Sequence, residues 1–204
     1  MTKTISRDRV IAAAVTLFAR AGFNGVTTKE IAQSADVSGG NIYRYFPTKR
    51  DLFLCALESE LQKLSVRAQQ REPAMIAADS RTALRAVVKT ITTTMVTQPD
   101  LVRLLHFSAL EFKCDTEPIF QRHVYPIFEA LVRHRQKCSC GACDIGQMST
   151  FLFFIATVIL LQDVIPSFSG YPSPFGSIES AATAYADLWC QGISMTPKAS
   201  SASG

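Results

Sequence analysis

Apolar residues recur at spacings of three and four along almost the whole chain of 204 residues. In residues 7–21, Ile11 and Phe18 fall on one side of a predicted helix, with Ser6 as the expected N-cap and Gly22 as the stop. No segment shows the strict alternation of apolar and polar residues that predicts a half-buried strand. The spacing therefore predicts an all-α fold of about nine helices.

Polar residues mark where the second predicted helix begins and ends. Thr27 is its expected N-cap, and Glu30 three residues later completes a capping box, in which each residue bonds the backbone of the other. This helix is short and ends near Ala35. Asp36 and Val37 then form a tight turn.

A third and a fourth helix follow directly. Ser38 is the expected N-cap of the third, which reaches about Phe46 because Pro47 disfavours helical geometry in the residue before it. Thr48 is the expected N-cap of the long fourth helix, and the apolar pattern resets beyond Pro73. The fourth helix joins a small three-helix unit to a larger helical body.

The helical pattern predicts three parts of the chain. Residues 1–50 form the small three-helix unit, residues 51–195 the larger helical body, and residues 196–204 a disordered tail. Within the larger domain, one helix is entered through Pro99, and another, over 120–131, is kinked at Pro126.

The composition also indicates where the protein works. The N-terminus lacks the apolar stretch of a secretory signal. The most apolar run, residues 151–161, is about half the roughly 20 residues that a membrane span needs. We therefore expect a cytoplasmic protein with no membrane partner, whose six cysteines are thiols rather than disulfides.

Positive charge is concentrated at the N-terminal end. Residues 1–50 hold eight lysines and arginines against three acids, a net +5, and the remaining 154 residues have a net −1. A basic end on a nearly neutral body indicates an anionic partner for that end.

The third helix has the residues of a nucleic-acid reader. Two short helices joined by a tight turn have the layout of a helix-turn-helix, and the amides at the start of its second helix attract phosphate. Asn41 matches the edge of an adenine and Arg44 that of a guanine. Gly39 and Gly40 cost roughly 1 kcal/mol each in a helix, and we interpret them as positions where the backbone closes on double-stranded DNA.

Threonine, tyrosine and lysine side chains nearby can bond phosphates and set the register on the duplex. The residues predicted to contact DNA are Thr27, Thr28, Ser38, Gly39, Gly40, Asn41, Tyr43, Arg44, Tyr45 and Lys49. Taken singly, each has a plainer interpretation: the glycines as a loop, Arg44 as a solvated charge, and Tyr43 or Phe46 as a core residue. Their combination with the net charge of +5 favours DNA.

Residues of about 5–54 resemble the N-terminal domain of TetR-type (tetracycline-repressor-like) transcriptional regulators. The resemblance rests on "AAAVTLFARAGFNGVTTKEIAQSADVS" and "NIYRYFPTKRDL". It implies a homodimeric repressor that binds a palindromic operator and is released by a small molecule bound in the C-terminal body. It also implies DNA-facing positions, which are Thr27, Thr28, Ser38, Gly39, Gly40, Asn41, Tyr43 and Lys49. Relatives often have a longer side chain where this chain has Gly39. Because glycine has no side chain to contact a base, base reading is expected to fall to Asn41 and Arg44.

The body is rich in phenylalanine, which predicts a core and an apolar pocket for an apolar or aromatic effector. Four residues are candidates for the polar part of that pocket: His106, Glu111, Tyr125 and Gln162. Predicted helices over 145–165 and 177–194 have the composition of half an intersubunit four-helix bundle, with a monomer core as the alternative.

Two other functions are alternatives to transcriptional regulation. A helical enzyme lacks support, because no nucleophile, phosphate-loop or metalloprotease motif occurs, and no catalytic residue, cofactor or metal is expected. A metal- or thiol-sensing regulator could use Cys138, Cys140 and Cys143, with His134 as a fourth ligand. A plain connector is the favoured interpretation of that segment.

Overall fold

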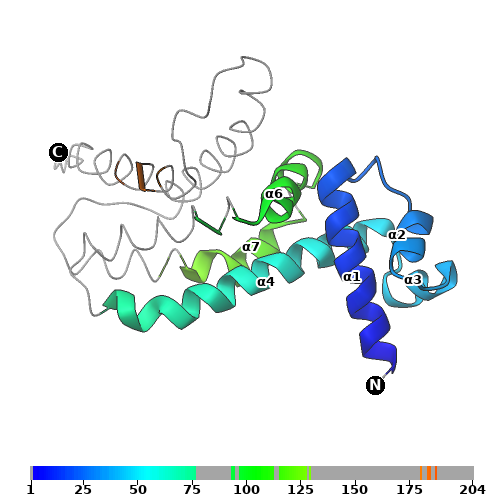
Figure 1. Ribbon diagram of the computed structural model, residues 1–204, viewed down its shortest axis with the longest axis horizontal. Helices are drawn as coiled ribbons and strands as arrows, with labels where there is room; N and C mark the ends of the chain where they lie inside the picture. Colours follow the sequence, from blue (N-terminus) through cyan, green and yellow to red (C-terminus); the bar gives the residue numbers. More distant parts are fainter. Residues whose placement is uncertain are drawn as a thin grey trace, which may run out of the picture. The chain divides into compact units, whose positions relative to one another are not determined.

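The structure is a computed structural model that describes residues 2–76, 93–94, 97–112, 115–127 and 129, together with single residues near the C-terminal end: Ser180, Thr183, Ala184 and Asp187. Every regular element among these residues is an α-helix (Figure 1), which confirms the predicted all-α class. No helix in this part of the chain is both long enough and apolar enough to cross a membrane.

The chain forms two compact units. The first consists of residues 1–66 and 98–124, and the second of residues 67–97 and 125–204. The first unit holds α1, α2, α3, the beginning of α4, α6 and α7, and it contains all residues predicted to contact DNA. The predicted domain ranges and the number of helices remain predictions.

Helix α1 spans Thr2–Ala21 and therefore begins before the expected N-cap at Ser6. That prediction was wrong because residues 2–6 contain neither glycine nor proline, so the helix continues through them. Its end was predicted correctly. Gly22 has a φ of 73°, and its amide donates to the Phe18 carbonyl at 2.9 Å.

Helix α2, Thr28–Ser34, begins with the predicted capping box. The Thr27 amide donates to the Glu30 carboxylate at 2.7 Å, and the Glu30 amide donates to the Thr27 hydroxyl at 3.2 Å. The turn after the helix is also confirmed, since Asp36 has a φ of 53°.

Helix α3 spans Gly39–Tyr45, with Ser38 as its N-cap residue but without a side-chain capping bond. Helix α4, Lys49–Ile76, begins at Thr48, whose amide donates to the Asp51 carboxylate at 2.9 Å. The sequence predicts that the fourth helix ends near Pro73, but α4 continues for about one further turn. A proline removes only its own amide bond, and the helix ends three residues later.

Two further helices complete the first unit. Helix α6, Pro99–Glu111, begins with the predicted proline, and α7 spans Glu117–His123. The predicted helix over 120–131 with a kink at Pro126 agrees in part: α7 starts earlier and ends at His123, a turn follows at Val124, and residues 125–127 and 129 are helical again. Pro126 has no amide hydrogen to donate to the carbonyl four residues earlier, which accounts for the interruption just before it.

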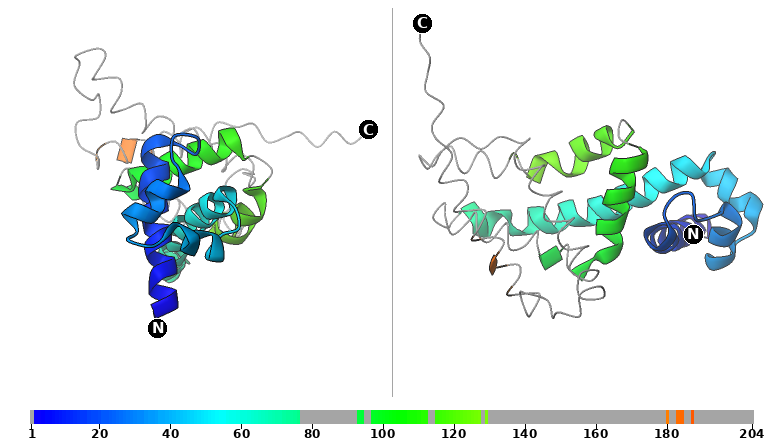
Figure 2. Two further views of the ribbon diagram at one scale, coloured as in Figure 1. Left: turned by 90° about the vertical axis from the view of Figure 1, so that its right-hand side faces the viewer. Right: turned by 90° about the horizontal axis from the view of Figure 1, so that it is seen from above.

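Four phenylalanine rings form the centre of the first unit. Phe53 of α4 is fully buried and lies 5.1 Å from Phe18 of α1 and 4.9 Å from Phe112 at the end of α6, between ring centroids. Phe23 joins this cluster, 4.8 Å from Phe112. Helix α1 also contacts α2, α3 and α6, and the right-hand view of Figure 2 shows α6 crossing α4. The cluster thereby fixes α1 on the start of α4.

Candidate nucleic-acid interface

Helices α2 and α3 lie side by side next to α1 (Figure 1). Their inner faces are apolar: Ile31 and Ala32 of α2 and Ile42 of α3 are buried. Because these three side chains face the interior, the opposite faces of both helices are left to solvent. Among the predicted DNA contacts on these two helices, Gly39, Gly40, Tyr43 and Arg44 are exposed.

Thr28 and Tyr43 meet across the two helices. Their hydroxyl oxygens are 2.9 Å apart, and 55% of the Tyr43 surface is exposed. The alternative that Tyr43 is a core residue was therefore wrong. The hydrogen bond fixes the position of the tyrosine hydroxyl, which can still bond a phosphate because each hydroxyl has one donor and two acceptor sites. Thr27 is exposed at the start of α2.

The two adjacent glycines are exposed on the first turn of α3, so the alternative that they form an ordinary loop was wrong. A β-carbon added at Gly39 or Gly40 would have no atom within 4 Å, and neither residue has a positive φ. Gly25 is the opposite case, because its added β-carbon would lie 2.2 Å from the Ala21 carbonyl oxygen. Within the part of the chain that the structure describes, packing and backbone conformation do not require glycine at 39 and 40.

The three residues expected to read or grip DNA have different surroundings. Asn41 is half-buried on the first turn of α3. The Arg44 guanidinium lies 4.9 Å from the centre of the Tyr45 ring and donates to its hydroxyl at 2.9 Å. The Lys49 ammonium lies 4.3 Å from the centre of the Phe23 ring. Arg44 and Lys49 are thus already held by aromatic rings.

A groove of about 610 Å³ opens between α2 and α3. It is lined by Thr28, Lys29, Ala32, Gln33, Val37, Gly39 and Tyr43. Sequence reasoning missed Lys29 and Gln33. Their spacing of four residues, which places both on one side of α2, is the signal that could have found them.

The residues expected to line an effector pocket are only partly described. His106 is half-buried in α6, and its Nδ1 lies 2.8 Å from the Val102 carbonyl oxygen, to which it donates. Glu111 is exposed and accepts a hydrogen bond from the Asn24 amide at 3.5 Å. Both belong to the first unit, whereas Tyr125 belongs to the second. Gln162 lies outside the described residues, so the pocket stays a prediction.

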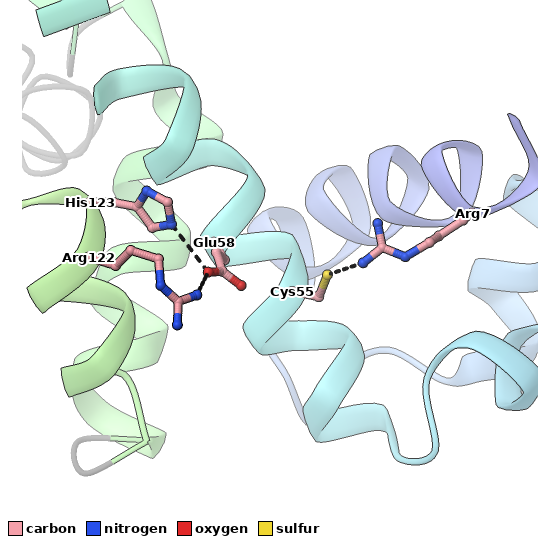
Figure 3. A network of polar contacts seen from close by, with 5 residues as sticks. All are labelled: Arg7, Cys55, Glu58, Arg122 and His123. Atoms are coloured by element: carbon pink, nitrogen blue, oxygen red, sulfur yellow. Dashed lines mark hydrogen bonds and ion pairs between the residues drawn. The ribbon is translucent and has the colours of Figure 1, made fainter. Parts of the chain in front are cut away.

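A polar network connects α4 to α1 and α7 (Figure 3). Arg7 donates to the Cys55 sulfur at 3.2 Å, while Glu58 pairs with Arg122 and lies 3.2 Å from Nε2 of His123. Burial raises the pKa of the Cys55 thiol, although nearby Arg7 acts in the opposite direction. Cys55 is therefore a neutral free thiol at neutral pH.

The capping box of α2 predicts a pH-dependent contribution to stability. Hydrogen bonds from Thr27 lower the pKa of Glu30 below its ordinary value of 4.5. The box therefore stabilises the folded chain above that pH and loses this effect as pH falls through the lowered pKa. We expect Glu30→Gln, which keeps the hydrogen-bonding geometry but does not titrate, to remove this part of the acid sensitivity. Urea unfolding of both proteins above and below pH 4.5 measures it. If the wild type and Glu30→Gln lose the same free energy of unfolding on acidification, the assignment to Glu30 is wrong.

Residues 10–56 match the family profile described as bacterial regulatory proteins, tetR family. This match covers both predicted helix-turn-helix helices and the start of α4. The N-terminal segment of the chain therefore matches the TetR family. The resemblance inferred from the residues is thereby confirmed.

Relatives match the chain over the same N-terminal end. The HTH-type transcriptional repressor KstR of Rhodococcus jostii is 35% identical over 63 residues, 31% of this chain and 30% of the relative. The HTH-type transcriptional regulator QacR of Staphylococcus aureus is 40% identical over 57 residues, 28% of this chain and 30% of the relative. The matched segment thus spans under a third of the length of these relatives.

The likeness of fold extends further. The solved structure of the transcriptional regulator FadR from Bacillus subtilis, in complex with stearoyl-CoA, matches with a TM-score of 0.63 and 16% identity. The match covers 90% of this chain and 97% of that chain. At this identity, the likeness shows the fold alone.

Proposed function

We propose that this protein is a TetR-family transcriptional regulator, a repressor, that binds a palindromic DNA operator as a homodimer and is released by a small apolar or aromatic molecule. The outer face of α2 and α3 is the observation that supports the proposal most. Its paired hydroxyls at Thr28 and Tyr43 and its two glycines without an internal packing role suit a surface that docks against double-stranded DNA.

The proposed roles divide into base reading and phosphate contact. Asn41 and Arg44 read base edges in the major groove, where amide and guanidinium groups match adenine and guanine. The hydroxyls of Thr28 and Tyr43 and the ammonium of Lys49 bond phosphates and set the register. Arg44 is stacked on Tyr45, so its guanidinium is presented in a restrained position.

The proposed effector site and dimer contact belong to the C-terminal body. The predicted helices over 145–165 and 177–194 lie almost wholly outside the described residues, so their role as an intersubunit bundle rests on their sequence. The stearoyl-CoA bound to FadR, which shares the fold, supports an apolar effector. Because its proposed target is DNA, we infer that the protein works in the cytoplasm.

Other functions have weaker support. The relatives are transcriptional regulators, so an enzymatic function is not proposed. The metal- or thiol-sensing alternative rests on Cys138, Cys140 and Cys143, which lie outside the described residues, and the comparisons do not favour it.

Selection from a random library of double-stranded DNA tests the proposal. We expect a palindromic site whose half-sites lie about 34–36 Å apart, because a two-fold dimer places its two recognition helices one helical turn apart. Affinity should fall steeply with salt because phosphate contacts dominate it. The double variant Asn41→Ala/Arg44→Ala should keep its helical content and select no palindrome. Recovery of unrelated sequences by the wild type would refute the function.

A further inference from the structure

Lys29 differs from the other basic side chains near α2 and α3. Arg9 pairs with Asp36 at 3.5 Å, and Arg44 and Lys49 lie over aromatic rings. Lys29 is exposed and has no hydrogen bond, ion pair or ring contact within the part of the chain that the structure describes. Its ammonium is therefore available to a partner without first leaving another group.

Lys29 also lines the groove between α2 and α3, together with Gly39. Since Gly39 has no side chain and its surroundings are open to 4 Å, it leaves space in the groove on the α3 side. Ala32 and Val37, two small apolar residues, line the groove as well. A bulky group from outside can enter here without displacing any side chain at position 39.

The groove opens on the same face as the proposed phosphate contacts. Thr28 and Tyr43, which we assign to phosphates, line it as well, so a duplex docked on their hydroxyls would present its groove edges to Lys29. The major-groove edge of guanine offers two acceptors, O6 and N7, to a lysine ammonium. The unpaired ammonium of Lys29 is complementary to these two acceptors.

We propose that Lys29 is a specificity-determining residue that binds the major-groove edge of a guanine, and that the missing side chain at Gly39 opens the groove for that base pair. This inference rests on the proposed DNA-binding function. It transfers part of base recognition from α3 to α2, so that Asn41 and Arg44 do not read the operator alone.

Affinities for every single-base-pair variant of the selected site test the role of Lys29. We expect Lys29→Ala to lose about tenfold to hundredfold discrimination for guanine at one position of each half-site, and Lys29→Arg to retain it. Lys49→Ala is the phosphate reference and should weaken all sequences alike, lowering the salt slope by about one. Lys63→Ala, which removes an α4 charge paired with Glu60 at 2.5 Å, controls for net charge.

Substitutions at Gly39 test the groove. Gly39→Ala and Gly39→Leu should keep the thermal midpoint within a few degrees, because the added atoms enter open space. The loss of operator affinity should grow with the size of the side chain, to more than tenfold for leucine. Circular dichroism verifies that each variant is folded before affinities are compared.

The outcomes separate this inference from the proposed function. If the wild type selects a palindrome but Lys29→Ala binds every variant site as the wild type does, Lys29 has no role and the inference is wrong. If Lys29→Ala weakens all sequences equally, Lys29 is a phosphate contact and the inference is also wrong. A wild type that selects no site would overturn both.

Discussion

Phe53→Ala is expected to lower the free energy of unfolding of the first unit by about 3–5 kcal/mol. The side chain is 0% exposed and has ring contacts with Phe18, Phe23 and Phe112, at centroid distances of 5.1, 5.8 and 4.9 Å. Truncation removes its buried surface and leaves a cavity between α1, α4 and α6. Because those helices enclose the site from three sides, the cavity cannot close without moving one of them.

Urea unfolding followed by circular dichroism measures this loss. Leu110→Ala is the matched control, since Leu110 is 82% exposed on α6 and its truncation should change stability by less than about 0.5 kcal/mol. A loss for Phe53→Ala no larger than that of Leu110→Ala would mean that the phenylalanine cluster does not hold the first unit together.

Features determined by neighbouring residues were predicted from the sequence. The capping box of Thr27 and Glu30 and the stop at Gly22 each depend on atoms within four residues along the chain. The tight turn at Asp36 follows the same rule. Such features are visible in a pattern because the partner residue has a fixed spacing.

Helix bounds without a local signal were predicted less well. No cap marks the start of α1, so Ser6 was chosen although the helix begins at Thr2. The end of α4 was missed because Pro73 does not end that helix, and the start of α7 was missed because no side-chain capping bond marks it. How far a helix continues depends on the packing of its last turns, which a single segment does not reveal.

The candidate interface shows the same division. Residues on α3 were found from their types and order, and the structure places Tyr43 and the two glycines outside, as predicted. The groove was not predicted, because it exists only where α2 packs against α3 and its walls come from both helices. The ring contact of Lys49 with Phe23 spans 26 positions in the sequence and was equally invisible.

Ile42→Ala is expected to cost about 2–5 kcal/mol and, unlike Phe53→Ala, to unfold one helix before the rest. Ile42 is 1% exposed and is the buried side chain of α3, a helix of seven residues. A helix this short is not stable in water without tertiary contacts. Its orientation, and hence the positions of Asn41 and Tyr43 toward DNA, therefore depends on that one side chain.

Native-state hydrogen exchange tests this expectation at the Phe46 amide, which donates to the Ile42 carbonyl at 2.8 Å. Its protection should fall in Ile42→Ala far more than that of the Gly22 amide at the end of α1, and selective DNA binding should be lost at the same time. Ile42→Val, which removes one methylene, should cost only about 0.5–1.5 kcal/mol and keep both. Equal loss of protection at both amides would show that α3 unfolds only with the whole unit, so the interface would have no stability separate from that of its scaffold.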